Sequence, residues 1–211
     1  MKRGFFITFE GSEGSGKSTQ ARLLAQFLRR RGYRVRLTHE PGGTAFGAAI
    51  RQILLHAKTQ RLTPAMELAL FMASRVQLVD EVILPSLQRG NVVICDRFLD
   101  STLAYQGGGS GLSLVAIQTL GRLVTQGLAP DLTFLLDLPV AAGFRRLDRR
   151  RDRMEAKTRA YHARVRRQYL ALARAEPRRI VRLDARQPVT KLQRAIQTLA
   201  LRRLRRRRRP R

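Results

Sequence analysis

The sequence predicts an α/β fold in which helices cover both faces of a parallel β-sheet, giving three layers. Short apolar runs alternate with longer stretches of helical periodicity, the pattern of successive βαβ units. The first apolar run, Phe5–Glu10, leads into Gly11–Ser18, which fits the pattern G-x-x-x-x-G-K-[ST] of a phosphate-binding loop between a strand and a helix. Because βαβ crossovers join parallel strands with a right-handed turn, we expect a parallel sheet.

Five strands are predicted from apolar runs that are bounded by turn-forming residues. Their almost continuous apolar character is typical of parallel strands buried on both faces. In chain order they are Phe5–Glu10, Tyr33–Leu37, Asn91–Cys95, Leu132–Leu136 and Arg179–Leu183.

Helices are predicted between these strands from apolar residues spaced three and four apart. The first helix opens at the phosphate loop and stops at Gly32. A capping pair, Thr63 and Pro64, opens another helix, which Pro85 limits. The glycines at 107–109 indicate a mobile or tightly turned segment. The other predicted helices run over Phe46–Leu54, Ser101–Gln106, Ser113–Gln126 and Val189–Leu204.

Length and composition favour one globular domain. The chain has 211 residues, 44% of them hydrophobic, which is enough for one substantial core. No apolar run approaches the roughly 20 residues that cross a bilayer, and no signal peptide precedes the first strand, so we expect a cytoplasmic protein without a membrane segment. Cys95 is the only cysteine, which excludes an internal disulfide. We expect a single domain over residues 1–204 and an arginine-rich tail over 205–211.

The charge of the chain is strongly positive. Lys and Arg number 42 against 15 Asp and Glu, a formal charge of +27, which raises nucleic-acid binding as a first hypothesis. Much of the excess lies in Arg145–Arg167 and Arg202–Arg211, and aromatic residues are not interleaved with it, so base-stacking platforms are not evident. An anionic substrate accounts for part of the charge and a polyanion-attracting tail for another part. The sequence does not separate the two.

Several polar residues follow predicted strands, at the edge of the sheet where α/β folds bind ligands. In the phosphate loop, Lys17 suits the β- and γ-phosphates of a nucleotide and the Ser18 hydroxyl suits Mg²⁺. Asp96 and Arg97 end the third strand, and they suit a magnesium-associated carboxylate and a phosphate clamp. The turn at 38–44 is either part of a ligand site or a plain surface turn.

Taken together, these stretches resemble the successive signatures of the thymidylate kinase family. They occur in the family's order, and the match continues to residues 184–188. The stretches that carry the resemblance are Phe9–Gln20, Glu40–Thr44, Ala73–Gln77, Asp96–Ser101, Ala104–Gly109 and Ala129–Thr133.

The resemblance implies a P-loop NTPase-type fold with a five-stranded parallel sheet, in a homodimer. It implies transfer of the γ-phosphoryl group of ATP to dTMP, with Mg²⁺ as cofactor. Such a site needs no general base, because a nucleoside monophosphate is mostly dianionic at pH 7. The task is to align two anions and neutralise the transferring group, which suits Lys, Arg and Mg²⁺.

The same resemblance assigns roles to individual residues. Lys17, Asp96, Arg97 and Glu13 would be catalytic, with Ser18 and Asp96 at the metal. Phe71 would stack on thymine, Arg75 and Gln106 would meet its polar edge, and Tyr105 would lie by the sugar. The ATP site would comprise Gly11, Ser12, Glu13, Gly14, Ser15, Gly16, Lys17, Ser18, Thr19 and Arg186. The dTMP site would comprise Glu40, Pro41, Gly42, Gly43, Arg51, Phe71, Arg75, Arg97, Ser101, Tyr105 and Gln106.

A mobile lid is expected at about residues 143–156. Family members place a cation over the transferring phosphate either from the phosphate loop or from the lid, and this loop contains no arginine. The resemblance therefore assigns the task to Arg149, Arg150 and Arg153. The lid is about two residues shorter than usual, His39 stands where arginine is usual, and Ala156 and Lys157 replace an acidic pair.

Two alternatives remain open from the sequence. One is a kinase of the same fold for another monophosphate, such as dUMP or dCMP, because a methyl group contributes only about 1–3 kcal/mol of discrimination. The other is a nucleic-acid-binding protein with a degraded kinase site, which the charge of +27 would suit.

Overall fold

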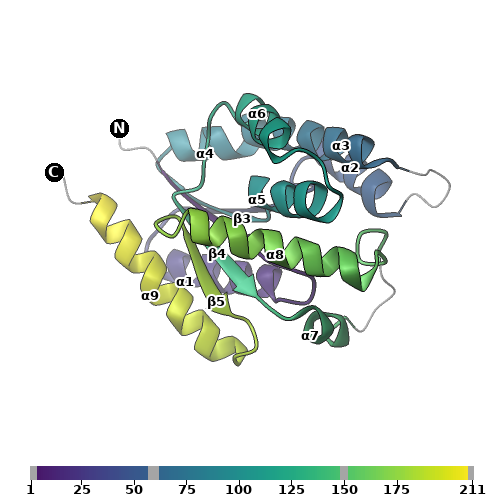
Figure 1. The fold of residues 1–211 in the computed structure, drawn as a ribbon. Coiled ribbons are helices and arrows are strands. Elements are labelled where there is room, and N and C mark those ends of the chain that lie inside the picture. Colours follow the sequence, from purple (N-terminus) through teal and green to yellow (C-terminus); the bar gives the residue numbers. More distant parts are fainter. Residues whose placement is uncertain (1–3, 57–61, 148–151, 209–211) are drawn as a thin grey trace.

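The computed structural model describes residues 4–56, 62–147 and 152–208. One sheet of five parallel strands, in the order β2-β3-β1-β4-β5, forms the centre of the molecule (Figure 1). The predicted five-stranded parallel sheet is therefore confirmed. The strands are β1 (Phe5–Glu10), β2 (Val35–His39), β3 (Val92–Asp96), β4 (Leu132–Asp137) and β5 (Ile180–Asp184).

Helices cover the sheet on both faces, so its central strands are buried on each side. On one face, α1 (Lys17–Arg30) and α9 (Val189–Arg208) pack over strand residues such as Ile7 and Phe134. The opposite face, which includes Phe6, lies under most of the other helices. These are α2 (Ala45–His56), α3 (Pro64–Leu78), α4 (Leu84–Gln88), α5 (Leu99–Thr102), α6 (Leu114–Val124), α8 (Arg159–Ala175) and the π-helical segments η1 (Val79–Ile83) and η2 (Leu103–Gly109). The short helix α7 (Val140–Arg145) follows β4, and its Ala142 packs against the cluster under α1 and α9.

Three strands begin and end one or two residues later than predicted: β3, predicted as Asn91–Cys95 and observed as Val92–Asp96, and the two edge strands. The predicted Tyr33–Leu37 is observed as Val35–His39, and the predicted Arg179–Leu183 as Ile180–Asp184. An edge strand is partly exposed, so polar residues take part in its ladder, and His39 pairs with Asp96. The last helix likewise runs on to Arg208, beyond the predicted end at Leu204.

Two predicted helix breaks are wrong. Pro85 does not end its helix, because the wider π-helical turn of η1 leads directly into α4, with Pro85 in the first turn of α4. The glycines at 107–109 are helical, as the last part of η2. A Cβ on Gly109 would lie 2.6 Å from the ring of Tyr161, so these glycines permit close packing of η2 on α8.

Among the described residues, we find no helix that combines the length and the apolar character needed to span a bilayer.

Candidate active site

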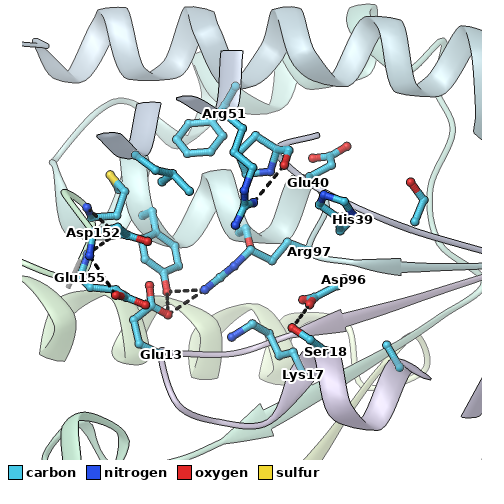
Figure 2. A pocket seen from close by; sticks show the side chains of 18 of the residues that line it. Glu13, Lys17, Ser18, His39, Glu40, Arg51, Asp96, Arg97, Asp152 and Glu155 are labelled. Atoms are coloured by element: carbon cyan, nitrogen blue, oxygen red, sulfur yellow. Dashed lines mark hydrogen bonds and ion pairs between the residues drawn. The ribbon is translucent and has the colours of Figure 1, made fainter. Parts of the chain in front are cut away.

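A cavity of about 620 Å³ opens at the carboxyl edge of the sheet, between the phosphate loop and α3. The register of the strands brings polar ends together there, because Asp96 lies beside both Phe9 and His39 in the ladders. Figure 2 shows Lys17, Ser18 and Asp96 on one side of this cavity and Asp152 and Glu155 on another. Residues from both the predicted ATP site and the predicted dTMP site thus line one cavity, among them Lys17, Ser18, Arg51, Phe71, Arg75 and Arg97.

The phosphate loop turns sharply between β1 and α1, as predicted. Gly14 has φ +67°, and a Cβ on it would lie 2.4 Å from the carbonyl oxygen of Gly143 in α7, so the loop tolerates no side chain there. The Lys17 ammonium donates to the Ser12 carbonyl at 2.9 Å and to the Ser15 hydroxyl at 3.4 Å. Burial and the charge of Arg97 lower the pKa of Lys17 to about 8. Lys17 therefore lies folded over the loop. A phosphate dianion bound beside it would raise its pKa and keep the ammonium group charged.

Ser18 and Asp96 suit a magnesium ion. The Ser18 hydroxyl donates to Asp96 Oδ2, and Asp96 Oδ1 is buried with no partner among the described residues. In the same residues no group of three or more His, Cys, Asp or Glu is arranged to hold a metal. Mg²⁺ commonly takes one or two protein ligands and completes its shell with phosphate oxygens and water, so the pair fits this ion.

Arg97 lies at the centre of the cavity with its backbone in the left-handed region, at φ +73°. Its Nη2 donates to Glu13 at 2.7 Å and to the Tyr105 hydroxyl at 3.2 Å, while Nη1 donates to Ser101 Oγ at 3.2 Å. Burial raises the pKa of Glu13, but the charges of Arg97 and Lys17 outweigh it and hold that pKa below its usual value. Arg97 is thus fixed beside the phosphate loop, where a second anion would meet it.

Sequence reasoning missed Glu10, which supports this arginine. Its carboxylate accepts from the Phe98 amide at 2.7 Å, from Ser101 Oγ at 2.6 Å and from the Tyr169 hydroxyl at 3.0 Å. Burial and the charge of Asp100 raise the pKa of Glu10 to about 7. The available signal was a carboxylate at the end of a strand of almost continuous apolar character, where burial requires partners.

The far end of the cavity is formed by α3 and η2. Phe71, Arg75 and Gln106 line it, as predicted for a base site. Arg75 is 1% exposed, and its Nη2 contacts Glu40 at 2.6 Å and Thr102 at 3.0 Å. The three residues thus lie together at one end of the cavity. The sequence did not predict that Glu40 holds Arg75.

The turn after β2 closes the side of the cavity. Arg51 reaches in from α2, and its Nη1 donates to the Pro41 carbonyl at 3.0 Å (Figure 2). Gly42 and Gly43 follow Pro41 but do not line the cavity. His39 does line it, and burial together with the charge of Arg51 lowers the pKa of His39, so the imidazole is neutral at pH 7.

The lid residues divide into three groups. Asp152 and Glu155 line the cavity, and the backbone amide of each donates to the side-chain carboxylate of the other, at 3.1 and 2.9 Å. Arg153 is not brought to the phosphate loop, because its Nε donates to the Leu54 carbonyl at 2.8 Å and its Nη1 lies 3.3 Å from Glu67. The other two predicted lid arginines, Arg149 and Arg150, lie outside the described residues.

Arg186, a predicted ATP contact, lies beyond the end of β5. It forms an exposed ion pair with Asp184 at 2.8 Å and does not line the cavity. Its side chain would have to leave this pair to meet a nucleotide.

Comparisons with known proteins agree with this geometry. A family model described as thymidylate kinase matches residues 9–196. The chain is 50% identical over 200 residues to a thymidylate kinase of Methylococcus capsulatus, covering 94% of this chain and 95% of the relative. It is 47% identical over 201 residues to one of Pelobacter propionicus, covering 92% of each.

The fold is also similar to a solved structure. The crystal structure of thymidylate kinase from Ehrlichia chaffeensis superposes with a TM-score of 0.78 at 35% identity, covering 94% of this chain and 99% of that one. Because the family model and the relatives span most of its length, the chain belongs to the thymidylate kinase family.

Proposed function

We propose that this protein transfers the γ-phosphoryl group of ATP to dTMP, forming dTDP and ADP. The observation that carries the proposal is one continuous cavity with the phosphate loop at one end, Phe71, Arg75 and Gln106 at the other, and Arg97 between them. Membership of the thymidylate kinase family supports the same reaction.

The geometry suits alignment of two anions rather than covalent or base catalysis. Lys17 would meet the β- and γ-phosphates of ATP, while Arg97 and Arg51 would hold the phosphate of dTMP in line with them. Ser18 and Asp96 would hold Mg²⁺, which neutralises charge on the phosphates when it is bound. Glu13 holds Arg97 by its ion pair at 2.7 Å, so it would position the acceptor clamp.

A panel of nucleoside monophosphates tests the proposed reaction. With ATP and Mg²⁺ present, dTMP is expected to give the highest kcat/KM, and dUMP to follow with a loss of about 10- to 200-fold for the missing methyl group. ADP release coupled to a reporter enzyme measures each rate. Equal or higher kcat/KM for dCMP or another monophosphate would contradict the assignment of Phe71, Arg75 and Gln106 to thymine.

A homodimer is proposed on the face formed by α3 and α6, which pack against each other. Val76 on α3 and Val115 and Leu123 on α6 are 36%, 72% and 75% exposed. Exposed apolar side chains on adjoining helices are typical of a subunit interface. Light scattering should give twice the chain mass of 24.0 kDa, and a mass of one chain would contradict the dimer.

A second surface, at the end of the molecule away from the cavity, is proposed to attract polyanions. Both α1 and α9 start near the cavity edge, where Gln20 donates to the Val189 carbonyl, and α1 alone extends about 20 Å. Exposed arginines gather at the far ends of these helices, and Leu28 and Leu204 from the same ends share one apolar cluster. We call these residues the basic end: Arg29, Arg30, Arg31, Arg202, Arg205 and Arg206.

The charge of the basic end is not compensated within the described part of the chain. None of its six arginines forms an ion pair there, whereas the nearby Asp131 already pairs with Arg207. The apolar side of α9, including Leu204, is buried in the core. The exposed arginines at this end of α9 therefore remain available to a phosphate backbone.

The salt dependence of nucleic-acid binding tests this proposal. The variant R202Q/R205Q/R206Q is expected to weaken binding of a labelled DNA duplex and to reduce the slope of log K against log salt by about 3, because each phosphate that an arginine neutralises adds roughly 0.9 to that slope. Fluorescence anisotropy at several salt concentrations measures both.

The matched control removes three exposed arginines elsewhere, as R122Q/R159Q/R167Q. If both variants lower the slope equally, the chain binds DNA through its overall charge and the basic end has no special role.

A further inference from the structure

Glu67 is a buried carboxylate behind the base pocket. It lies on the same face of α3 as Phe71 and Arg75, at four-residue spacing, but it does not line the cavity as those two residues do. Its exposure is 2%. A buried carboxylate needs partners, and three side chains supply them.

Two of these partners are cations, Arg153 from the predicted lid and Lys157 just after it. The Lys157 ammonium lies 2.8 and 2.9 Å from the two carboxylate oxygens, and Arg153 Nη1 lies 3.3 Å from Oε1. Lysine and arginine only donate hydrogen bonds, so Glu67 accepts from both. The third partner is Gln106, whose Nε2 donates to Glu67 Oε2 at 3.3 Å.

The contact with Glu67 determines which way the Gln106 amide points. A carboxylate anion can only accept hydrogen bonds, whereas an amide has one donating and one accepting end. The NH₂ group of Gln106 must therefore face Glu67. Its oxygen is left at the cavity, which Gln106 lines, and nothing in the described parts of the chain donates to that oxygen.

A hydrogen-bond acceptor at this position distinguishes bases by whether their ring nitrogen N3 carries a proton. Thymine and uracil carry a proton on N3 and donate there, whereas cytosine N3 only accepts. The Gln106 oxygen therefore matches thymine and uracil, and cytosine would require the amide to turn over. Turning it over would place its oxygen against Glu67, with the loss of a hydrogen bond to a charged group.

We propose that Glu67 is a positioning residue that sets the preference for a base with an N3–H group over cytosine, by fixing the orientation of the Gln106 amide. This inference rests on the proposed dTMP site. It concerns a residue that touches no substrate and acts through Gln106.

The variant E67Q tests the inference. The introduced side-chain oxygen would remain with Lys157 and Arg153, so its NH₂ group would face Gln106 and favour the reversed amide. We expect the ratio of Kd for dCMP to Kd for dTMP to fall by roughly 10- to 100-fold, the value of a hydrogen bond to a charged group. Calorimetry with dTMP, dUMP and dCMP measures the three constants.

The Kd for dUMP distinguishes a change in the orientation of the Gln106 amide from general damage to the pocket. Uracil and thymine present the same N3–H, so E67Q should leave the ratio for dUMP and dTMP within about twofold. An unchanged ratio for dCMP, or equal changes for dCMP and dUMP, would overturn the inference.

The variant K157Q is the matched control, because it removes a charge from the same cluster while Glu67 remains an acceptor. It should leave both ratios unchanged. If E67Q alone does not fold, E67Q/K157Q removes one charge of each sign and carries the same expectation for dCMP. Because binding is measured, a chain that bound dTMP selectively but transferred no phosphoryl group would contradict the proposed reaction and leave this inference standing.

Discussion

Replacing Lys17 by methionine is expected to lower kcat for phosphoryl transfer by about 10²- to 10³-fold, the typical loss when one charged or hydrogen-bonding group is removed from a transition state. Lys17 is 8% exposed and folded over the loop, with its ammonium 2.9 Å from the Ser12 carbonyl. Methionine preserves the length of the side chain and removes the charge. Steady-state kinetics with ATP and dTMP measure the effect.

The pH dependence of the wild-type reaction provides an independent check on Lys17. Since its pKa is lowered to about 8 in the free protein, the charged form that binds ATP declines as the pH rises through 8. We expect kcat/KM for ATP to fall tenfold per pH unit above that value. At saturating ATP the phosphates stabilise the ammonium, so kcat should fall only at higher pH. A flat kcat/KM up to pH 10 would contradict the role of Lys17.

Lys191 provides the control for the substitution. It is an exposed lysine in the first turn of α9, outside the cavity, and K191M makes the same chemical change. Its kinetic constants should equal those of the wild type. If K17M raised only the KM for ATP and left kcat unchanged, Lys17 would bind the ground state and the transition state equally, and its proposed catalytic role would be wrong.

The residues at the ends of strands were predictable because their place follows from local sequence. A parallel sheet aligns its carboxyl ends, so Asp96, Arg97 and the phosphate loop had to meet once the strands were recognised. Phe71 and Arg75 share a helix face by their spacing alone. Their assignment to a base, however, came from resemblance to a family, because the same spacing is typical of core packing.

The contacts that hold these residues were not predictable, because each partner lies far along the chain. Glu10 meets Tyr169 across 159 positions and Glu67 meets Lys157 across 90. No local pattern encodes such pairs. The direction of Arg153 was missed for the same reason, since the Leu54 carbonyl and Glu67 that engage it belong to α2 and α3.

Replacing Arg75 by methionine is expected to destabilise the protein by about 3–5 kcal/mol, because it leaves a buried charge without its partner. The two side chains of the pair are 1% and 3% exposed, and Arg75 Nη2 lies 2.6 Å from Glu40 Oε2. For a chain of this length the loss corresponds to a fall in Tm of roughly 6–20 °C. Calorimetric or circular-dichroism melting measures the change.

The destabilisation by R75M should depend on pH in a definite direction. Burial already raises the pKa of Glu40, and the charge of Arg75 opposes that rise. Without Arg75, the pKa of Glu40 in the folded protein rises further above its value in the unfolded chain. At a pH between these two pKa values, the folded protein binds more protons than the unfolded chain. Stability of the variant relative to the wild type is therefore expected to improve as the pH falls and to decline as it rises.

The double variant E40Q/R75M separates the cost of an unpaired charge from the loss of the pair itself. It removes both charges, so it should recover much of the stability lost in R75M. It should not recover dTMP binding, because the Arg75 guanidinium that lines the base pocket is still missing. If the double variant melted no higher than R75M, the loss would come from packing around Met72 and Phe98 and not from the isolated carboxylate.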